Sequence, residues 1–135
     1  MASQQSCREL LVNLAPNLDP APWVFTPLST ETEPSFSDKG VFALIREDEG
    51  LTAIQRAIPK TTHDDPPLFA RITLQVYSDL EAVGLTAAIS RALTDRGICA
   101  NVVAGFHHDH VFVPFHRGEE ALQCLKDLAT ATDSP

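Results

Sequence analysis

Four consecutive polar residues, His107, His108, Asp109 and His110, carry the densest group of reactive side chains in the chain. Imidazole and carboxylate groups are common ligands of zinc and similar metals. On a strand, however, side-chain alternation would point His108 and His110 to one face and the other two residues to the opposite face. A closed site would then need His116 or another residue. The four residues are therefore a weak metal-site candidate, and a polar hairpin turn explains them as well.

The same residues leave open a metal-dependent hydrolase or lyase that uses the His107–His110 turn, with one imidazole as general base. The sequence contains no HExxH or CxxC motif, no nucleophile elbow and no Gly-rich phosphate loop. The sequence supplies no obvious nucleophile or oxyanion donor for such a general base to serve. The sequence therefore predicts no metal and no cofactor, and it favours a protein that is not an enzyme.

A second group of candidate residues lies directly after the strand expected over residues 71–77, in which Ile72, Leu74 and Val76 alternate with more polar residues. Residues 78–81, SDLE, have the S-x-x-E form of a capping box, which predicts a helix that begins after Ser78. A helix N-terminus presents free N–H groups and partial positive charge, which suit a carboxylate. Gly84 has no side chain, so a ligand or another backbone could approach there. The alternative is that Ser78 and Glu81 only cap the helix and Gly84 only permits packing.

A third group, Glu49, Gly50, Leu51 and Thr52, repeats the G-L-T of residues 84–86. Both copies lie near the start of a predicted helix, so two equivalent helix openings could face one cleft and hold one ligand between them. A chance match of three residues is the alternative interpretation. On the first interpretation, these four residues line the ligand.

Asn101 interrupts an otherwise apolar strand expected over residues 98–106. A buried polar group must find a hydrogen-bond partner. We expect Asn101 either to hold the loop at Ser78 in place or to contact a ligand directly.

Capping residues, apolar periodicity and prolines predict the elements that position these groups. Expected loops are the polar segment 29–39 and the linker 60–67. The tail 131–135 is expected to be frayed. Helices are expected over residues 7–15, 51–58 after an acidic start at 47–49, 79–96 and 119–130, and strands over residues 23–25, 40–46, 71–77, 98–106 and 110–115.

An internal repeat relates the two halves, because each gives helix, strand, strand and helix in that order. Val41-Phe42 matches Val111-Phe112, and residues 51–57 match residues 122–128 with one insertion. The strand 71–77 stands between the halves and can belong to either. A ferredoxin-like βαββαβ unit buries one sheet face under its helices. A unit of about sixty residues is marginal alone, so the units should share their sheets or dimerise.

The predicted fold class is therefore α+β, with two ferredoxin-like units of antiparallel sheet and with helices on one face. The expected boundaries are residues 6–66 for the first unit, which is irregular and begins with a helix, and 67–131 for the second. Residues 132–135 form a tail.

Bulk composition limits the classes of partner. A net charge of −8 disfavours nucleic acid and anionic membranes, since like charges repel. The longest apolar runs are too short for a membrane-spanning helix, and the N-terminus lacks the pattern of a secretory signal. Three cysteines, Cys7, Cys99 and Cys124, suggest reduced thiols rather than a disulfide framework. Together these features predict a cytoplasmic protein.

Three segments resemble the small tandem ACT-domain proteins, which are related to the ACT pairs of the CASTOR-type amino-acid sensors. They are EDEGLT (47–52), ITLQVYSDLEAVGLTAAISRAL (72–93) and ICANVVAGFHHDHVFVP (98–114), where Cys99 stands in place of a serine. The resemblance runs from Leu10 to Leu128 and is most specific over residues 78–114. It implies a regulatory protein that binds a small ligand, most often an amino acid, where paired domains meet.

The resemblance also implies which residues contact the ligand, since the ACT-type ligand sits where the loop after the central strand, residues 71–77, meets a neighbouring domain. Asp79 or Glu81 could meet an ammonium group. A homodimer is implied, together with an unidentified protein partner that receives the signal; a ligand-free interaction module is the remaining alternative. The implied ligand-binding residues are Ser78, Asp79, Leu80, Val83, Gly84 and Leu85.

Overall fold

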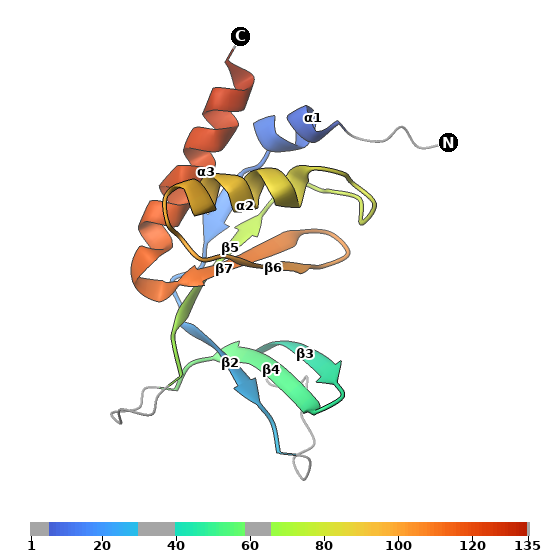
Figure 1. Ribbon diagram of the computed structural model, residues 1–135, viewed down its shortest axis with the longest axis vertical. Coiled ribbons are helices and arrows are strands. Elements are labelled where there is room, and N and C mark those ends of the chain that lie inside the picture. Colours follow the sequence, from blue (N-terminus) through green and yellow to red (C-terminus); the bar gives the residue numbers. More distant parts are fainter. Residues whose placement is uncertain (1–5, 30–39, 59–65, 135) are drawn as a thin grey trace.

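The computed structural model describes residues 6–29, 40–58 and 66–134, so nearly all of the predicted loop over residues 29–39 and most of the predicted linker over residues 60–67 lie outside the described residues. Three helices pack on one side of a curled antiparallel sheet (Figure 1). The elements are α1 (Cys7–Val12), β1 (Pro16–Leu18), β2 (Trp23–Pro27), β3 (Val41–Glu47), β4 (Gly50–Arg56), β5 (Phe69–Leu74), α2 (Leu85–Asp95), β6 (Asn101–Ala104), β7 (Asp109–Pro114), the 3-10 helix η1 (Phe115–Arg117) and α3 (Gly118–Asp133).

The sheet has seven strands in the order β3-β4-β2-β5-β7-β6, and β1 pairs with β5 outside this path. All pairings are antiparallel. Strand β5 is flanked on one side by β7 and on the other by β1 and the start of β2, where Trp23 pairs with Phe69. The N-terminal and C-terminal halves therefore share one sheet, as the marginal size of each half predicts.

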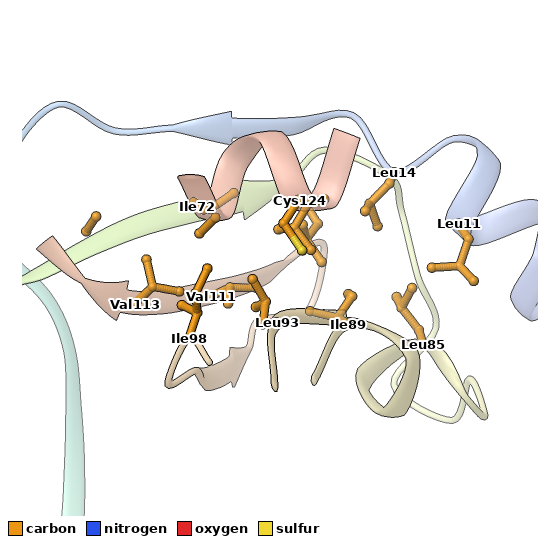
Figure 2. Packing of buried hydrophobic residues seen from close by; sticks show 14 of the residues in the cluster. Leu11, Leu14, Ile72, Leu85, Ile89, Leu93, Ile98, Val111, Val113 and Cys124 are labelled. Carbon is orange, nitrogen blue, oxygen red and sulfur yellow. The ribbon is translucent and has the colours of Figure 1, made fainter. Parts of the chain in front are cut away.

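The larger hydrophobic core lies between the helices and one face of the sheet (Figure 2). Alternate residues of β5, Ile72 and Leu74, point into it, as the two-residue periodicity predicts. The apolar periodicity that predicts a helix over residues 79–96 is also confirmed in α2, because Leu85, Ile89 and Leu93, spaced four residues apart, are at most 2% exposed. Burial of each such side chain contributes about 1.5–3 kcal/mol. Other residues of this core include Leu10, Leu11 and Leu14 of the N-terminal segment and Ala121, Cys124 and Leu125 of α3.

A smaller aromatic core occupies the opposite face of the sheet. Phe42, on the edge strand β3, contacts His110 and Phe112 of β7 with ring centroids 4.8 and 5.5 Å apart. Three strands separate β3 from β7 in the sheet order. The sheet must therefore curl back over its own face. Trp23, Ile54 and Phe112 are the buried residues of the aromatic core inside this curl.

The predicted helix over residues 51–58 is wrong, because residues 50–56 form strand β4. Asp48 and Glu49 are the two turn residues of a β3–β4 hairpin, in which Glu47 pairs with Gly50. The acidic residues that suggested a helix start instead build a tight turn, and Gly50 takes a φ of +141° there. The match of residues 51–57 with 122–128 is wrong for the same reason, since the second segment lies in α3.

The predicted helix start at Ser78 is also wrong. Helix α2 begins at Leu85, with Gly84 as its N-cap, and no side chain caps it. Residues 75–84 form an irregular connection, and the S-x-x-E pattern does not form a capping box. At the other end the prediction is confirmed, because Gly97 follows α2 with a φ of +70°.

Three smaller differences concern the chain ends and connections. The Ser6 hydroxyl caps α1 by accepting from Glu9 N at 3.1 Å, as predicted, but α1 ends at Val12. Residues 16–18, which lie between the expected helix 7–15 and the expected strand 23–25, form β1 and pair with β5. Helix α3 continues to Asp133, into the segment expected to be frayed. Hydrophobic contacts of α1 and α3 with the shared core hold both ends in place.

Candidate ligand-binding site

The connection between β5 and α2 is held against the β6–β7 turn by contacts from both segments. Ser78 Oγ donates to Asp109 Oδ2 at 3.5 Å. His108 Nδ1 lies 3.5 Å from the main-chain oxygen of Val76, and its ring stacks on Tyr77 with centroids 4.9 Å apart. Burial raises the pKa of Asp109, while the Ser78 hydroxyl opposes that rise. The two loops therefore form one surface at the N-terminal end of α2.

Helix α2 presents its N-terminal amides next to this surface. The first main-chain hydrogen bond of the helix runs from Ala88 N to Gly84 O at 3.0 Å. The amides of Leu85, Thr86 and Ala87 precede it and have no acceptor within the helix. They carry the partial positive charge of a helix start, which favours an anion. The sequence predicts these free amides directly after Ser78. In the structure they belong to residues 85–87 instead, because α2 begins at Leu85.

Gly84 has a structural reason to be glycine. Its φ is +101°, outside the range that residues with a side chain readily adopt, and a Cβ there would lie 3.2 Å from Cys7 Sγ. Close packing of α1 on the start of α2 therefore explains this glycine without a ligand.

Four large apolar side chains are exposed on the two loops; we refer to them as the apolar patch. Tyr77 and Leu80 are 67% and 66% exposed, and Val83 and Phe106 are 83% and 79% exposed. Exposed apolar surface of this kind is common where a protein binds a partner or ligand. Leu85, by contrast, is buried, so only its main-chain N–H is available to a ligand.

The predicted shared cleft between residues 49–52 and the start of α2 is not present in the single chain. The β3–β4 hairpin lies at the lower end of the molecule in Figure 1, and the loop before α2 lies beside the helices. Thr52 Oγ1 donates to Glu47 Oε1 across the hairpin. The premise of two helix openings is wrong, and a ligand contact by Glu49, Gly50, Leu51 or Thr52 stays a prediction.

Asn101 is exposed on the edge strand β6 and is not the buried polar residue that the apolar strand predicts. The Ser78 loop is tied to Asp109 rather than to Asn101. A ligand contact by Asn101 stays a prediction.

The histidines separate into different environments. His110 Nδ1 lies 2.9 Å from Thr73 Oγ1, and burial lowers the pKa of His110 to about 4, helped by the nearby Arg71. His108 stacks on Tyr77, and His116 is exposed in η1. Within the described part of the chain, no three His, Cys, Asp or Glu side chains come close enough to hold a metal ion.

A polar cluster that the sequence did not predict lies between the layers of the curled sheet. Asp19 Oδ2 accepts from Arg71 Nη2 at 3.1 Å and from Trp23 Nε1 at 3.0 Å. The Arg71 guanidinium lies over the rings of Trp23 and Phe42, 4.7 and 4.8 Å from their centroids. The sequence signal that could have predicted this cluster is the alternation of Arg71 and Thr73 with apolar residues along β5. This alternation places polar side chains on the face of β5 opposite the helices. We assign this cluster a role in joining the layers.

Comparison with protein families identifies both halves of the chain. An ACT domain family matches residues 70–127, and a second ACT domain family matches residues 3–58. A Vibrio cholerae protein of unknown function has 38% sequence identity over 88% of this chain and 92% of its own, with a TM-score of 0.69. This is a tandem ACT-domain protein.

More distant solved structures share the fold of the tandem ACT-domain protein. An Agrobacterium tumefaciens protein matches 81% of this chain and 83% of its own at 24% identity, with a TM-score of 0.61. The regulatory subunit of aspartate kinase from Thermus thermophilus matches 86% and 97% at 11% identity, with a TM-score of 0.57. No protein with curated annotation matches the chain at a significant level.

ACT domains are regulatory modules that bind small ligands. The general functional class of this chain is therefore that of regulatory ligand-binding modules. Among the described residues, no helix has the length and apolar character needed to cross a membrane.

Proposed function

We propose that this tandem ACT-domain protein is a non-catalytic regulator that binds an amino acid or a related small carboxylate at the start of α2. Membership of the ACT family supports the ligand class. The observation that carries the location is the uncapped N-terminus of α2, whose free amides suit a carboxylate. The ligand-contacting residues are then Ser78, Asp79, Leu80, Val83, Gly84 and Leu85, the last through its main chain.

Charge and exposure around α2 support an amino acid in particular. Asp79 and Glu81 are exposed in the loop before the helix and provide carboxylates for the ligand ammonium. The loops lack compensating basic residues, because the sequence has no Lys or Arg between Arg71 and Arg91 or between Arg96 and Arg117. A zwitterion pairs its carboxylate with the helix amides and its ammonium with this acidic loop.

In this proposal a second copy of the chain covers the apolar patch and encloses the ligand. The patch leaves the ligand open to solvent in the single chain, and burial of four large side chains would favour association. Ligand binding then shifts the relative pose of two copies, provided that the ligand has different affinities for the two poses. A partner protein, in the cytoplasm, reads that change.

A thermal-denaturation panel of amino acids and small carboxylates tests the proposal. A ligand at 100 times its Kd stabilises the folded protein by about 2.7 kcal/mol, which raises Tm by several degrees. We expect Asp79→Ala to lose this stabilisation while the Tm without ligand stays unchanged, because Asp79 is exposed. Glu119→Ala, at an exposed position on α3, is the matched control and should keep the ligand-induced rise in Tm. If Asp79→Ala is stabilised as strongly as the wild type, the ligand binds elsewhere.

A further inference from the structure

A groove of about 360 Å³ opens between α1 and the chain that leaves β5. Its volume lies within the range of small-molecule sites, about 300–1,000 Å³. The apolar side chains of Leu10 and Val76 contribute to its lining. The polar and aromatic lining consists of Glu9 on α1, Asn13 at the C-cap of α1, and Gln75 and Tyr77 on the facing segment.

Main-chain hydrogen bonds hold the two walls of the groove together. Gln75 N donates to Ala15 O at 3.2 Å, and Val76 N donates to Leu14 O at 3.3 Å. Ala15 takes a φ of +47°, a left-handed conformation that is uncommon for residues other than glycine. The turn between α1 and β1 is thus fixed against the end of β5, which sets the spacing of the two walls of the groove.

The lining offers hydrogen-bond acceptors and no basic side chain. Asn13 Nδ2 donates to the main-chain oxygen of Glu9 at 2.9 Å, which leaves Asn13 Oδ1 available as an acceptor. Within the described residues, the Glu9 carboxylate and the side-chain amide of Gln75 have no hydrogen-bond partner. An ammonium group has three donors and no acceptor, so the oxygens of these three side chains suit it. The exposed ring of Tyr77 adds a face for cation–π contact.

We propose that this groove is a second ligand site, separate from the start of α2, that binds a small organic amine with an apolar body. Glu9 pairs with the ammonium group, Asn13 and Gln75 accept its remaining hydrogen bonds, and the apolar body lies against Leu10, Val76 and the ring of Tyr77. A free carboxylate is disfavoured, because Glu9 would repel it.

Titration of ¹⁵N-labelled protein with benzylamine, followed by nuclear magnetic resonance, tests the site. Benzyl alcohol is the neutral counterpart of the same shape. We expect benzylamine to shift the side-chain amide signals of Asn13 and Gln75 saturably, with a millimolar Kd, and benzyl alcohol to bind more weakly. Glu9→Gln should raise the benzylamine Kd about fivefold, as expected for one exposed ion pair. Glutamine at this position keeps the helix-start chemistry of α1.

Tyr77→Leu gives an independent test, because it removes the ring at an exposed position and should also raise the Kd. Glu119→Gln, at an exposed position on α3, is the matched control and should leave the Kd unchanged, whereas Asp79→Asn reports on binding at the loop before α2. Equal shifts from benzyl alcohol, an unchanged Kd in Glu9→Gln, or loss of binding only in Asp79→Asn would each overturn the proposal. Since the probe carries no carboxylate, its failure to bind the groove leaves amino-acid binding at α2 unaffected, and the two proposals fail separately.

Discussion

Asp19 is the acceptor on which the contacts between the two layers of the sheet converge. Its carboxylate accepts from Ala21 N at 3.1 Å, from Trp23 Nε1 at 3.0 Å and from Arg71 Nη2 at 3.1 Å. Burial lowers the pKa of Arg71, and the charge of Asp19 opposes this change. Arg71 Nε is buried without a hydrogen-bond partner in the described residues. The remaining interactions of Arg71, with Asp19 and the two rings, must offset that cost.

Asp19→Ala should destabilise the protein by about 2 kcal/mol, because it leaves a largely buried guanidinium and an indole N–H without their acceptor. The value is below that of a fully buried pair, since the Arg71 and Asp19 side chains are 23% and 17% exposed. Urea denaturation measures the change. Asp19→Asn, which keeps an acceptor for Trp23, should lose less. A loss in Asp19→Ala no larger than that in Asp19→Asn would contradict this role.

His110 should make the protein less stable as the pH falls. The pKa of His110 is about 4 in the folded chain, below the ordinary value of 6.5 for a histidine side chain. Between these values the unfolded chain binds a proton that the folded chain does not, so stability is complete above pH 6.5 and is lost as the pH falls towards 4. After discounting for partial exposure, we expect a loss of about 2 kcal/mol.

The difference in unfolding free energy between wild type and His110→Gln, measured from about pH 7.5 to about pH 4, isolates this effect. Burial raises the pKa of the neighbouring Asp109, which acts in the opposite direction but is present in both proteins. A difference that stays constant across this range would rule out a buried neutral His110.

At the scale of elements, the sequence predicts best where one face of an element is buried. The apolar spacing of Leu85, Ile89 and Leu93 identifies α2 because only a helix brings these residues to one face. Residues 51–58 satisfied the same spacing, yet Ala53 and Ile54, adjacent in sequence, are the buried residues of strand β4. The pairing partners of β4 lie in β2 and β3, and no local pattern reveals them.

The start of α2 could not be placed for a related reason. Ser78 has the sequence of a helix cap, but its hydroxyl bonds to Asp109, 31 residues away. The helix instead begins where Gly84 meets Cys7. The sequence therefore proposes a candidate site within one loop, but the start of the helix depends on contacts between distant segments.

Gly84→Ala should destabilise the protein by more than Gly97→Ala. Both glycines have positive φ, which costs about 1 kcal/mol or more for alanine. At Gly97 nothing lies within 4 Å of the added Cβ, whereas at Gly84 Cys7 Sγ lies 3.2 Å away. Chemical denaturation of both variants measures the difference.

Adding Cys7→Ala to Gly84→Ala separates the two costs. The second change should recover part of the loss when compared with Cys7→Ala alone, because it removes the crowded sulfur. If the two changes are simply additive, contact with Cys7 does not constrain Gly84.

At the scale of the whole molecule, the two ACT domains are one folded body rather than two. The N-terminal residues Leu10 and Leu14 are buried in the helical core, and β1 and β2 both flank β5. The sequence predicts this sharing from the small size of each half, but not the curl that brings Phe42 onto Phe112. Nor does it predict the groove beside α1, because Glu9 and Gln75 are far apart in the chain.

The apolar patch should mediate self-association. Val83→Asp introduces a charge at an 83% exposed position, so it should leave folding intact and convert a dimer to a monomer in sedimentation-velocity experiments. Ile58→Asp, at a 76% exposed position outside the patch, is the matched control and should remain dimeric. A dimer that survives Val83→Asp, or one lost equally in Ile58→Asp, would place the interface elsewhere.

Locating the bound carboxylate tests most directly whether the ligand binds at the start of α2. The amino acid or small carboxylate that raises Tm most should be titrated into ¹⁵N-labelled protein while the main-chain amide signals are followed. Carboxylate binding at the start of α2 predicts saturable shifts at Thr86 and Ala87, whose free amides would contact the ligand. It also predicts a higher Kd in Asp79→Ala. If no compound of the panel stabilises the wild type, or if the shifts are confined to residues outside 78–87, the claim that α2 holds a small carboxylate is contradicted.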